Sequence, residues 1–147
     1  MKIRPRKAKV CKWMSEETTC FEAEIVIDGK VAGHVSNEGH GGDNNYHFKD
    51  RAVEVAFEAY CKAMPPVKSE VGDLPMDMDL YVDQLLEAYE MDKQLRRWCK
   101  KQTVFRLPGD EEGSYRTLKR TPYGSKAKEW VMKKYPNAEI INERFAA

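Results

Sequence analysis

Several features that would place this chain in a large functional class are missing. No apolar run approaches the roughly 18 residues of a membrane-spanning helix, since the longest, from Ala23 to Ile27, already includes a glutamate. The basic N-terminus leads into no hydrophobic stretch and no small-residue cleavage site, so we expect no secretory signal. The sequence therefore predicts a cytoplasmic protein without a membrane partner.

Cysteine pairs and catalytic motifs are missing too. The four cysteines are widely spaced and form no CxxC pair, which argues against a zinc ribbon or a thioredoxin-type redox motif. The sequence has no GxSxG nucleophile elbow, and Cys20 with His34 is the only cysteine–histidine pair that strand pairing would bring onto one face. We therefore expect reduced thiols, no cofactor and no enzymatic activity.

The chain also lacks a net charge of one sign. Lys and Arg number 25 against 24 Asp and Glu, so no overall field attracts a polyanion and nucleic-acid binding would need local patches. Acidic and basic residues are nevertheless separated along the chain. Residues 70–92 contain acidic residues without any Lys or Arg, and residues 93–106 reverse the sign. These charged segments form either solvated surfaces or surfaces complementary to a charged partner.

What the chain does have is material for a folded core. Hydrophobic residues make up 41% of its 147 residues, which suits one ordinary domain and argues against disorder. Apolar periodicity and turn residues predict an α+β fold, in which about three helices pack on a mainly antiparallel sheet. We expect a single domain over residues 1–147, with residues 1–8 as a basic, flexible arm. The expected helices cover residues 50–64, 77–99 and 125–135, and the expected strands cover residues 9–14, 103–107, 115–119 and 138–142, beside a hairpin over residues 20–37.

The last expected helix carries two more detailed predictions. Ser125 is the candidate N-cap, because a serine hydroxyl can accept a hydrogen bond from the first helical turn. Ala127, Trp130 and Val131 are expected to be buried on the inner face of the helix. The segment before the second helix, residues 65–77, holds three prolines and is expected to be a linker.

The clearest local signal is the hairpin, which turns at Asp28 and Gly29. A two-residue loop there would pair Ile25 with Ala32 and split the apolar side chains between the two faces. A three-residue loop with Gly29 in a bulge would pair Ile25 with Val31 and collect the apolar side chains on one face. We prefer this second register.

The preferred register has a consequence for chemistry. It places Cys20, Glu22, His34 and Ser36 together on the polar face, with Glu22 opposite His34. This pair would lie at the start of a glycine-rich run, residues 37–45, which is predicted to be a loop.

All three histidines fall in or near this glycine-rich run, and two chemistries fit the window. Imidazoles with a carboxylate or thiolate can hold a metal, although the spacing matches no standard zinc pattern. A glycine-rich stretch before a helix can bind phosphate, although the run is neither GxGxxG nor a P-loop. The weak metal candidates are Glu22, His34, His40 and His47, and the candidate phosphate-binding residues are Gly41, Gly42, Asn44, Asn45 and Lys49.

A basic patch is a third candidate site. Arg96, Arg97, Lys100 and Lys101 close the second expected helix, beside Trp98. If Arg116, Lys119 and Arg120 of the following strand lie next to them, with Tyr115 and Tyr123 nearby, the patch has the composition used for backbone contact and base stacking in nucleic-acid binding. The alternative is that Trp98 belongs to the core and the arginines neutralise the acidic half of the helix.

Two runs of sequence resemble known proteins. GHVSNEGHGGDNNYHF and KYPNAEIINERF resemble segments of small uncharacterised proteins encoded by bacteriophages and other mobile elements. The resemblance implies an accessory protein, a class in which many members block host defence by binding a nuclease or sequestering a signal nucleotide. It implies no catalytic residues.

The leading hypothesis is a small non-enzymatic binding protein of this phage accessory type, which inhibits or sequesters a host defence component through its charged faces and the glycine-rich loop. The first alternative is a nucleotide- or nucleic-acid-binding protein that uses the loop and the basic patch. The second is a metal-dependent enzyme centred on the histidines, and homo-oligomerisation is left open. The candidate binding residues are His34, His40, Gly41, Gly42, Asp43, Asn44, Asn45, His47, Lys49, Asp79, Asp83, Glu87, Arg96, Arg97 and Lys101.

Overall fold

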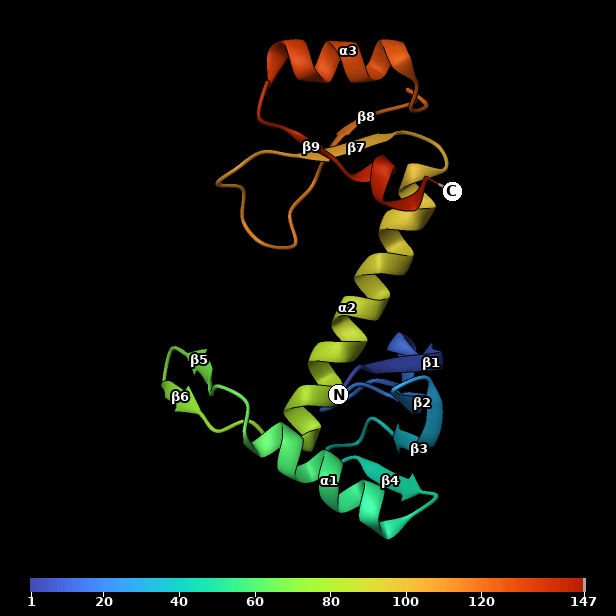
Figure 1. Cartoon of the computed structure of the whole chain (residues 1–147), viewed down its shortest axis with the longest axis vertical. Helices are drawn as coiled ribbons and strands as arrows, with labels where there is room; N and C mark the ends of the chain where they lie inside the picture. Colours follow the sequence, from blue (N-terminus) through green and yellow to red (C-terminus); the bar gives the residue numbers. More distant parts are fainter. Residues whose placement is uncertain (147) are drawn as a thin grey trace. The chain divides into compact units, whose positions relative to one another are not determined.

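The computed structural model describes residues 1–146 and has the predicted α+β fold, with antiparallel strand pairing throughout (Figure 1). The chain divides into two compact units, an N-terminal unit, Met1–Glu87, and a C-terminal unit, Ala88–Ala147. The boundary falls inside one continuous helix, α2 (Met78–Cys99), and not in a linker. No loop separates the two units, and the expectation of a single domain stays a prediction.

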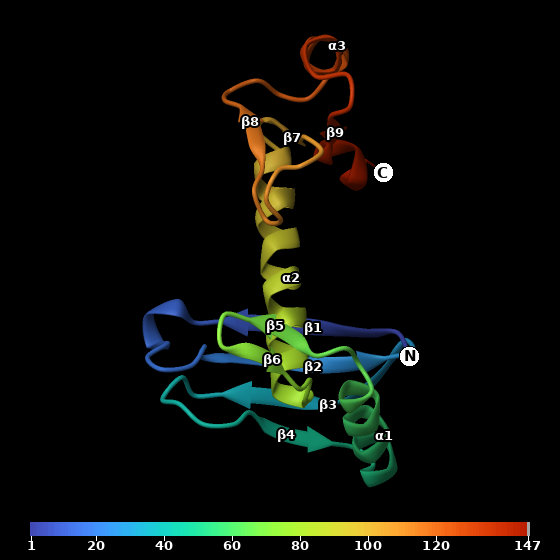
Figure 2. The same cartoon turned by 90° about the vertical axis from the view of Figure 1, so that its left-hand side faces the viewer.

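The N-terminal unit is built on a four-stranded antiparallel sheet in the order β1-β2-β3-β4 (Figure 2). Its strands are β1 (Ile3–Val10), β2 (Phe21–Ile27), β3 (Lys30–Asn37) and β4 (Asn45–Phe48). Residues 1–8, expected as a flexible arm, supply most of β1, because residues 3–6 pair with residues 24–27 of β2. The strand expected over residues 9–14 is instead the end of β1 followed by a 3₁₀ turn, η1 (Lys12–Met14).

The hairpin register preferred from the sequence is wrong. Ile27 pairs with Lys30, so the loop has two residues, and both Asp28 (φ 50°) and Gly29 (φ 83°) have positive φ. This is the backbone of a type I′ turn, which matches the twist of the strands. An irregularity in the ladder at Ala32 then shifts the pairing by one residue, so that Ile25 lies opposite Gly33.

The shift explains why both sequence arguments were partly right. The bulge lets the tight turn and the one-sided apolar face coexist, because the extra residue of β3 corrects the register that the turn would otherwise impose. Ala23 pairs with Val35 on the buried face, while Glu22 lies opposite Ser36 and Glu24 opposite His34. The four polar residues do share a face, but Glu22 does not lie opposite His34.

Helix α1 (Arg51–Lys62) and the first part of α2 supply the other half of this core. Asp50 caps α1 by accepting a hydrogen bond from the Ala52 amide (2.9 Å), and Asp77 does the same for the Leu80 amide at the start of α2 (2.8 Å). The expected linker contains a small hairpin, β5 (Val67–Ser69) with β6 (Gly72–Leu74). The buried hydrophobic side chains of the unit are Ala8, Phe21, Ala23, Ile25, Val26, Ala32, Val35, Phe57, Cys61, Met76, Val82 and Leu86.

The C-terminal unit contains the end of α2 and a three-stranded antiparallel sheet in the order β8-β7-β9 (Figure 1). Its remaining elements are β7 (Thr103–Arg106), β8 (Arg116–Leu118), α3 (Ser125–Lys134), β9 (Glu139–Ile140) and the 3₁₀ helix η2 (Ile141–Phe145). Two small clusters form its core, one around Leu95, Val104 and Ile141 and the other around Phe105, Val131 and Ile140.

Two predictions for α3 are corrected. Its N-cap is Gly124, which makes no side-chain hydrogen bond, and Ser125 is the first helical residue. Ala127 and Val131 are buried as expected, but the Trp130 side chain is 47% exposed. Lys134 lies 5.0 Å from the Trp130 ring centroid, so the indole is covered by a cation and not by the core. Within residues 1–146, no helix is both long enough and apolar enough to cross a bilayer.

Candidate functional site

The glycine-rich loop is organised by one buried side chain, Asn37, which is 5% exposed. Its Oδ1 accepts hydrogen bonds from the Thr18 hydroxyl (2.7 Å) and the Gly39 amide (2.9 Å). Its Nδ2 donates to the Gly42 carbonyl (3.3 Å) and to Asn44 Oδ1 (3.0 Å). Four hydrogen bonds from one buried amide give this loop a defined conformation.

A second loop, residues 15–19, packs against the glycine-rich loop. The Gly39 carbonyl accepts from the amides of Glu16 (2.9 Å) and Glu17 (3.2 Å), and the Gly41 amide donates to the Thr18 hydroxyl (3.2 Å). Gly39 has φ +87°, and a Cβ there would lie 2.6 Å from the Met14 carbonyl oxygen and 2.9 Å from Cys20 Cβ. Only glycine therefore allows the two loops to approach this closely.

Where the two loops meet the start of α2, they form an acidic pocket of about 390 Å³. Four carboxylate side chains line it, and no Lys, Arg or His does. All of the lining residues belong to the N-terminal unit. The residues of this acidic pocket are Ser15, Glu16, Glu17, Thr18, Thr19, Asn37, Gly42, Asn44, Asp79 and Asp83.

Strand β4 fixes one of these carboxylates. The Tyr46 hydroxyl donates a 2.6 Å hydrogen bond to Asp79 Oδ1 and accepts one from Asn44 Nδ2 (3.3 Å). Burial of the phenol, with the nearby Asp79 carboxylate, raises the pKa of Tyr46 well above its ordinary value, so the hydroxyl stays a donor. The Asp79 carboxylate is therefore held in place between the loop and the helix.

The second carboxylate on α2, Asp83, has no cation to balance it. Burial raises the pKa of Asp83, and the neighbouring carboxylates of Asp79, Glu87 and Asp77 add to the effect. Among the residues that the structure describes, neither Asp79 nor Asp83 takes part in an ion pair. The two α2 carboxylates of the pocket thus carry negative charge that no ion pair in the described part of the chain neutralises, whereas Glu16 contacts His40.

The three histidines do not form one cluster. His34 and His47 are cross-strand partners on β3 and β4, and Glu24 lies opposite His34 but is paired with Arg6 (2.6 Å). His40 lies on the loop and makes a 3.0 Å contact with Glu16, which raises the pKa of His40. No group of three His, Cys, Asp or Glu side chains within residues 1–146 is arranged to hold a metal ion.

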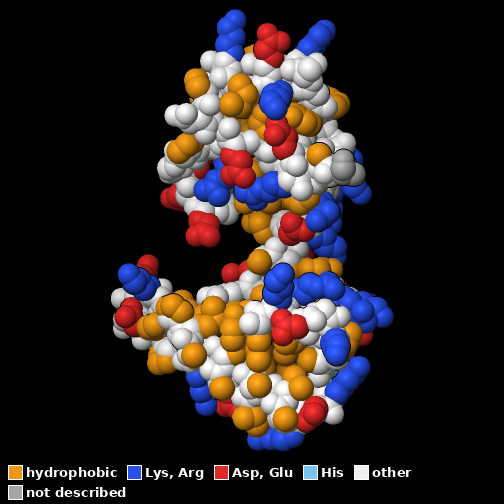
Figure 3. All heavy atoms as spheres, viewed as in Figure 1, with side chains coloured by type: hydrophobic (Ala, Val, Ile, Leu, Met, Phe, Trp, Pro, Cys, Tyr) orange, Lys and Arg blue, Asp and Glu red, His pale blue; other side chains and the backbone are white. Residues whose placement is uncertain are grey.

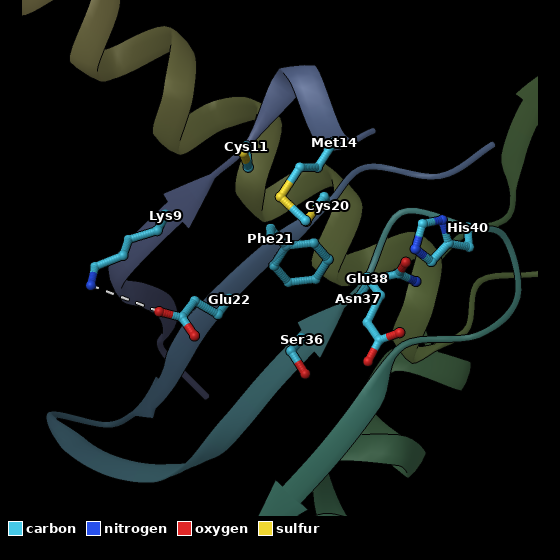
Figure 4. Close-up of a pocket in the computed structure, with 10 residues that line it drawn as sticks. All are labelled: Lys9, Cys11, Met14, Cys20, Phe21, Glu22, Ser36, Asn37, Glu38 and His40. Carbon is cyan, nitrogen blue, oxygen red and sulfur yellow. Dashed lines mark ion pairs between the residues drawn. The ribbon is translucent and has the colours of Figure 1, made fainter. Parts of the chain in front are cut away.

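The polar face of the hairpin opens onto a second pocket, of about 500 Å³ (Figure 4). Figure 4 shows Glu22 turned toward Lys9, with which it forms a 3.8 Å ion pair, and His40 at a distance from both. Cys11 and Cys20 lie on neighbouring segments here as free thiols. The predicted grouping of Cys20, Glu22 and Ser36 is present, but His34 does not line this pocket.

The phosphate-binding interpretation of the glycine-rich loop fits its surroundings poorly. Gly41 lies against the Glu17 carboxylate, since a Cβ there would be 2.6 Å from Glu17 Oε2, and Gly42 lines the acidic pocket with Asp79 and Asp83. These carboxylates would repel an anion. Of the other candidate residues, Asp43, Asn45, Lys49 and Glu87 are exposed and do not line the acidic pocket.

The basic candidates belong to the C-terminal unit. Arg96 pairs with Asp92 (2.8 Å) and Arg116 with Asp110 (3.1 Å), so both are partly neutralised. Within the described part of the chain, no ion pair involves Arg97 or Lys101. The glycine-rich loop and the basic patch, combined in one hypothesis from the sequence, thus fall in different units.

Sequence reasoning missed the residues that complete the acidic pocket. Glu16, Glu17 and Thr18 lie in a short polar run, SEETT, which reads as an ordinary loop. Tyr46 lies in β4, a strand that the sequence pattern does not predict. The one available signal was the acidic spacing of Asp79 and Asp83 on a helix, and nothing in the sequence shows which loops lie beside them.

Comparisons with known proteins found no family model that matches the chain, and no curated protein or solved structure similar to it. These comparisons therefore contribute nothing to the inference of function.

Proposed function

We propose that this chain is a non-enzymatic protein-binding module, and that its acidic pocket takes a Lys or Arg side chain from a partner protein. The single observation that carries the proposal is the pocket itself, which joins the glycine-rich loop to the acidic face of α2 and is lined by four carboxylates without a cation. These are the two surfaces that the leading sequence hypothesis used separately.

The charges of the pocket favour a cationic group there. The pKa of Asp83 is raised because burial and like charges destabilise its ionised form, so a cation placed between Asp79 and Asp83 would relieve the repulsion. Hydrogen bonds from Tyr46 and through Asn37 hold the pocket walls in place before binding. Binding would therefore cost little reorganisation.

The surface beside the pocket favours a protein over a small cation. Trp13 is 86% exposed on η1, two residues from Ser15 of the pocket, and Met14 between them is 41% exposed. Exposed tryptophan and methionine next to a charged pocket are typical of protein interfaces, where aromatic anchors supply much of the affinity.

The biological setting follows from the resemblance to bacteriophage and mobile-element proteins. As the partner we propose a host protein in the cytoplasm, which this chain inhibits or sequesters as an accessory protein of anti-defence type. A basic surface is common on proteins that handle nucleic acid, because phosphate binding requires Lys and Arg. An acidic pocket would compete with nucleic acid for such a surface.

A labelled tetralysine peptide tests the pocket directly. We expect saturable binding by fluorescence anisotropy, and roughly fivefold or greater weakening in the double variant Asp79→Asn/Asp83→Asn. The matched control is Glu70→Gln/Asp73→Asn, which removes two charges from the exposed β5–β6 hairpin and should change the affinity less than about twofold.

The outcomes separate the alternatives. Equal weakening in both double variants would mean that only overall charge matters, and absence of saturable binding would also overturn the proposal. Displacement of the peptide by stoichiometric Ca²⁺ or Mg²⁺ would identify a metal site instead. Circular dichroism of each variant checks that the fold is retained.

A further inference from the structure

We propose that the C-terminal unit holds a second and chemically opposite site, a cationic pocket with aromatic walls that takes an unpaired nucleotide. The nucleotide can be free or part of a single strand, since both present a base with two open faces and a phosphate. The inference is independent of the protein-binding role proposed for the N-terminal unit.

The pocket has a volume of about 510 Å³ and lies between the end of α2, the turn before α3 and η2. Two cations line it, and no Asp or Glu does. All of the lining residues belong to the C-terminal unit. The residues of this cationic pocket are Arg96, Cys99, Lys100, Pro122, Tyr123, Asn142, Phe145 and Ala146.

Its wall offers a surface for stacking. The Arg96 guanidinium carbon lies 4.6 Å from the Phe145 ring centroid, and the guanidinium is held by a 2.8 Å ion pair from its Nε to Asp92. Unpaired bases stack on aromatic side chains and on guanidinium planes, and this wall offers both. The ion pair uses only Nε, so the terminal nitrogens of Arg96 keep their donors for a phosphate or a base edge.

The carboxyl end of a helix normally repels anions, and a buried asparagine that lines the pocket satisfies part of this end of α2. Asn142, which is 7% exposed, donates from Nδ2 to the carbonyls of Cys99 (3.2 Å) and Gln102 (2.9 Å). Its Oδ1 accepts from the Val104 amide (2.7 Å). The carbonyl of Cys99, the last residue of α2, thereby has a hydrogen-bond donor within the protein.

Two further cations, Lys119 and Arg120, lie in the turn that precedes Pro122 and Tyr123 of the pocket. Thr103 donates two hydrogen bonds to the Thr121 carbonyl, from its amide (2.7 Å) and from its hydroxyl (2.9 Å). These bonds hold the turn that carries Lys119 and Arg120 beside the end of α2, which carries Lys100. Figure 3 shows Lys and Arg side chains gathered over the C-terminal half of α2.

The nearby acids are already engaged. Glu143 accepts from the Tyr123 hydroxyl (2.8 Å) and pairs with Lys128 (3.0 Å), and these contacts lower the pKa of Glu143. Asp92 is held by Arg96. Lys100, Lys119 and Arg120 take part in no ion pair within residues 1–146 and remain to contact phosphate.

The test uses the full chain, a fluorescein-labelled ten-residue oligothymidine and AMP as probes. We expect saturable binding of the oligonucleotide that weakens with salt, and roughly fivefold or greater weakening in Arg96→Gln/Lys100→Gln. The matched control, Lys126→Gln/Lys133→Gln, removes two exposed charges from α3 of the same unit and should change the affinity less than about twofold. Phe145→Leu keeps every charge and should also weaken binding, because stacking is lost.

AMP separates the two sources of the ligand. Competition by AMP supports a free nucleotide, and binding of the oligonucleotide without competition supports a single strand. Three results would overturn the proposal. They are equal weakening in Arg96→Gln/Lys100→Gln and in the control Lys126→Gln/Lys133→Gln, equal affinity for a blunt duplex, and no binding of either probe at 1 mM.

Discussion

The Tyr46 hydroxyl donates a 2.6 Å hydrogen bond to the Asp79 carboxylate, and this contact joins the edge strand β4 to the first turn of α2. This hydrogen bond connects several elements of the N-terminal unit. One partner lies beside the glycine-rich loop and the other in the acidic pocket, so the loop, the sheet and the helix are fixed together at the proposed binding site.

Removing this hydroxyl should weaken the N-terminal unit. Tyr46→Phe keeps the ring stacked on Phe48, with centroids 5.9 Å apart, but loses the hydrogen bond to a charged group. We expect the free energy of unfolding to fall by about 1–2 kcal/mol, measured by urea denaturation. Tyr60→Phe is the control, because the Tyr60 hydroxyl makes a long 3.5 Å bond to the Met1 carbonyl. Equal losses in the two variants would contradict the prediction.

Two glycines of the loop should respond differently to the same substitution. Both Gly39 (φ +87°) and Gly42 (φ +82°) have left-handed backbones, but a Cβ at Gly42 meets nothing within 4 Å. Gly42→Ala should therefore destabilise by about 1 kcal/mol, the conformational cost alone. Gly39→Ala adds overlap with the Met14 carbonyl and Cys20 Cβ, and we expect a loss greater than about 2 kcal/mol. Thermal unfolding of the two variants gives the comparison, and similar losses would show that the loops can separate.

The carboxylate of Asp83 should make stability depend on pH. Burial and neighbouring carboxylates raise its folded pKa above the ordinary 3.8, so the folded state binds this proton more tightly than the unfolded state. The contribution of Asp83 to stability therefore becomes less favourable as pH rises from near 3.8 through the raised value. Asp83→Asn should be more stable than the wild type at pH 7 and lose that advantage at pH 3.

Urea denaturation at the two pH values measures this difference, and Asp73→Asn on the exposed β5–β6 hairpin is the control. The same Asp83→Asn change should weaken binding of the tetralysine peptide. A gain in stability with a loss of binding is the pattern expected when a site keeps unfavourable charge for a ligand. A variant that is equally stable or less stable at pH 7 would contradict the prediction.

Local signals predicted much of the fold. Helix α2 was expected over residues 77–99 and covers Met78–Cys99, because its apolar residues recur at helical spacing. The helix expected over residues 50–64 is likewise present as α1, Arg51–Lys62. Where a local signal was ambiguous, the prediction failed: Trp130 had helical spacing with Val131 and Ala127, but its indole is exposed under Lys134.

Pairings between distant segments were beyond the sequence. The hairpin register depends on a bulge at Ala32, and no residue type at this position predicts a bulge. The contacts of Asn37 with Thr18 and of Tyr46 with Asp79 join residues 19 and 33 positions apart. Secondary-structure propensity and apolar spacing depend only on residues close together along the chain. They therefore cannot predict contacts between segments that are far apart in the sequence.

The amino-acid sequence by itself determined the α+β class, the three helices, the inner and outer faces of the first hairpin and the separation of acidic from basic residues along the chain. The tertiary structure alone decided which loops close around the acidic part of α2 and which aromatic residues line the basic end. The reason is physical. Periodicity and caps act within a few residues, whereas a binding pocket is made by segments that meet only after the chain has folded.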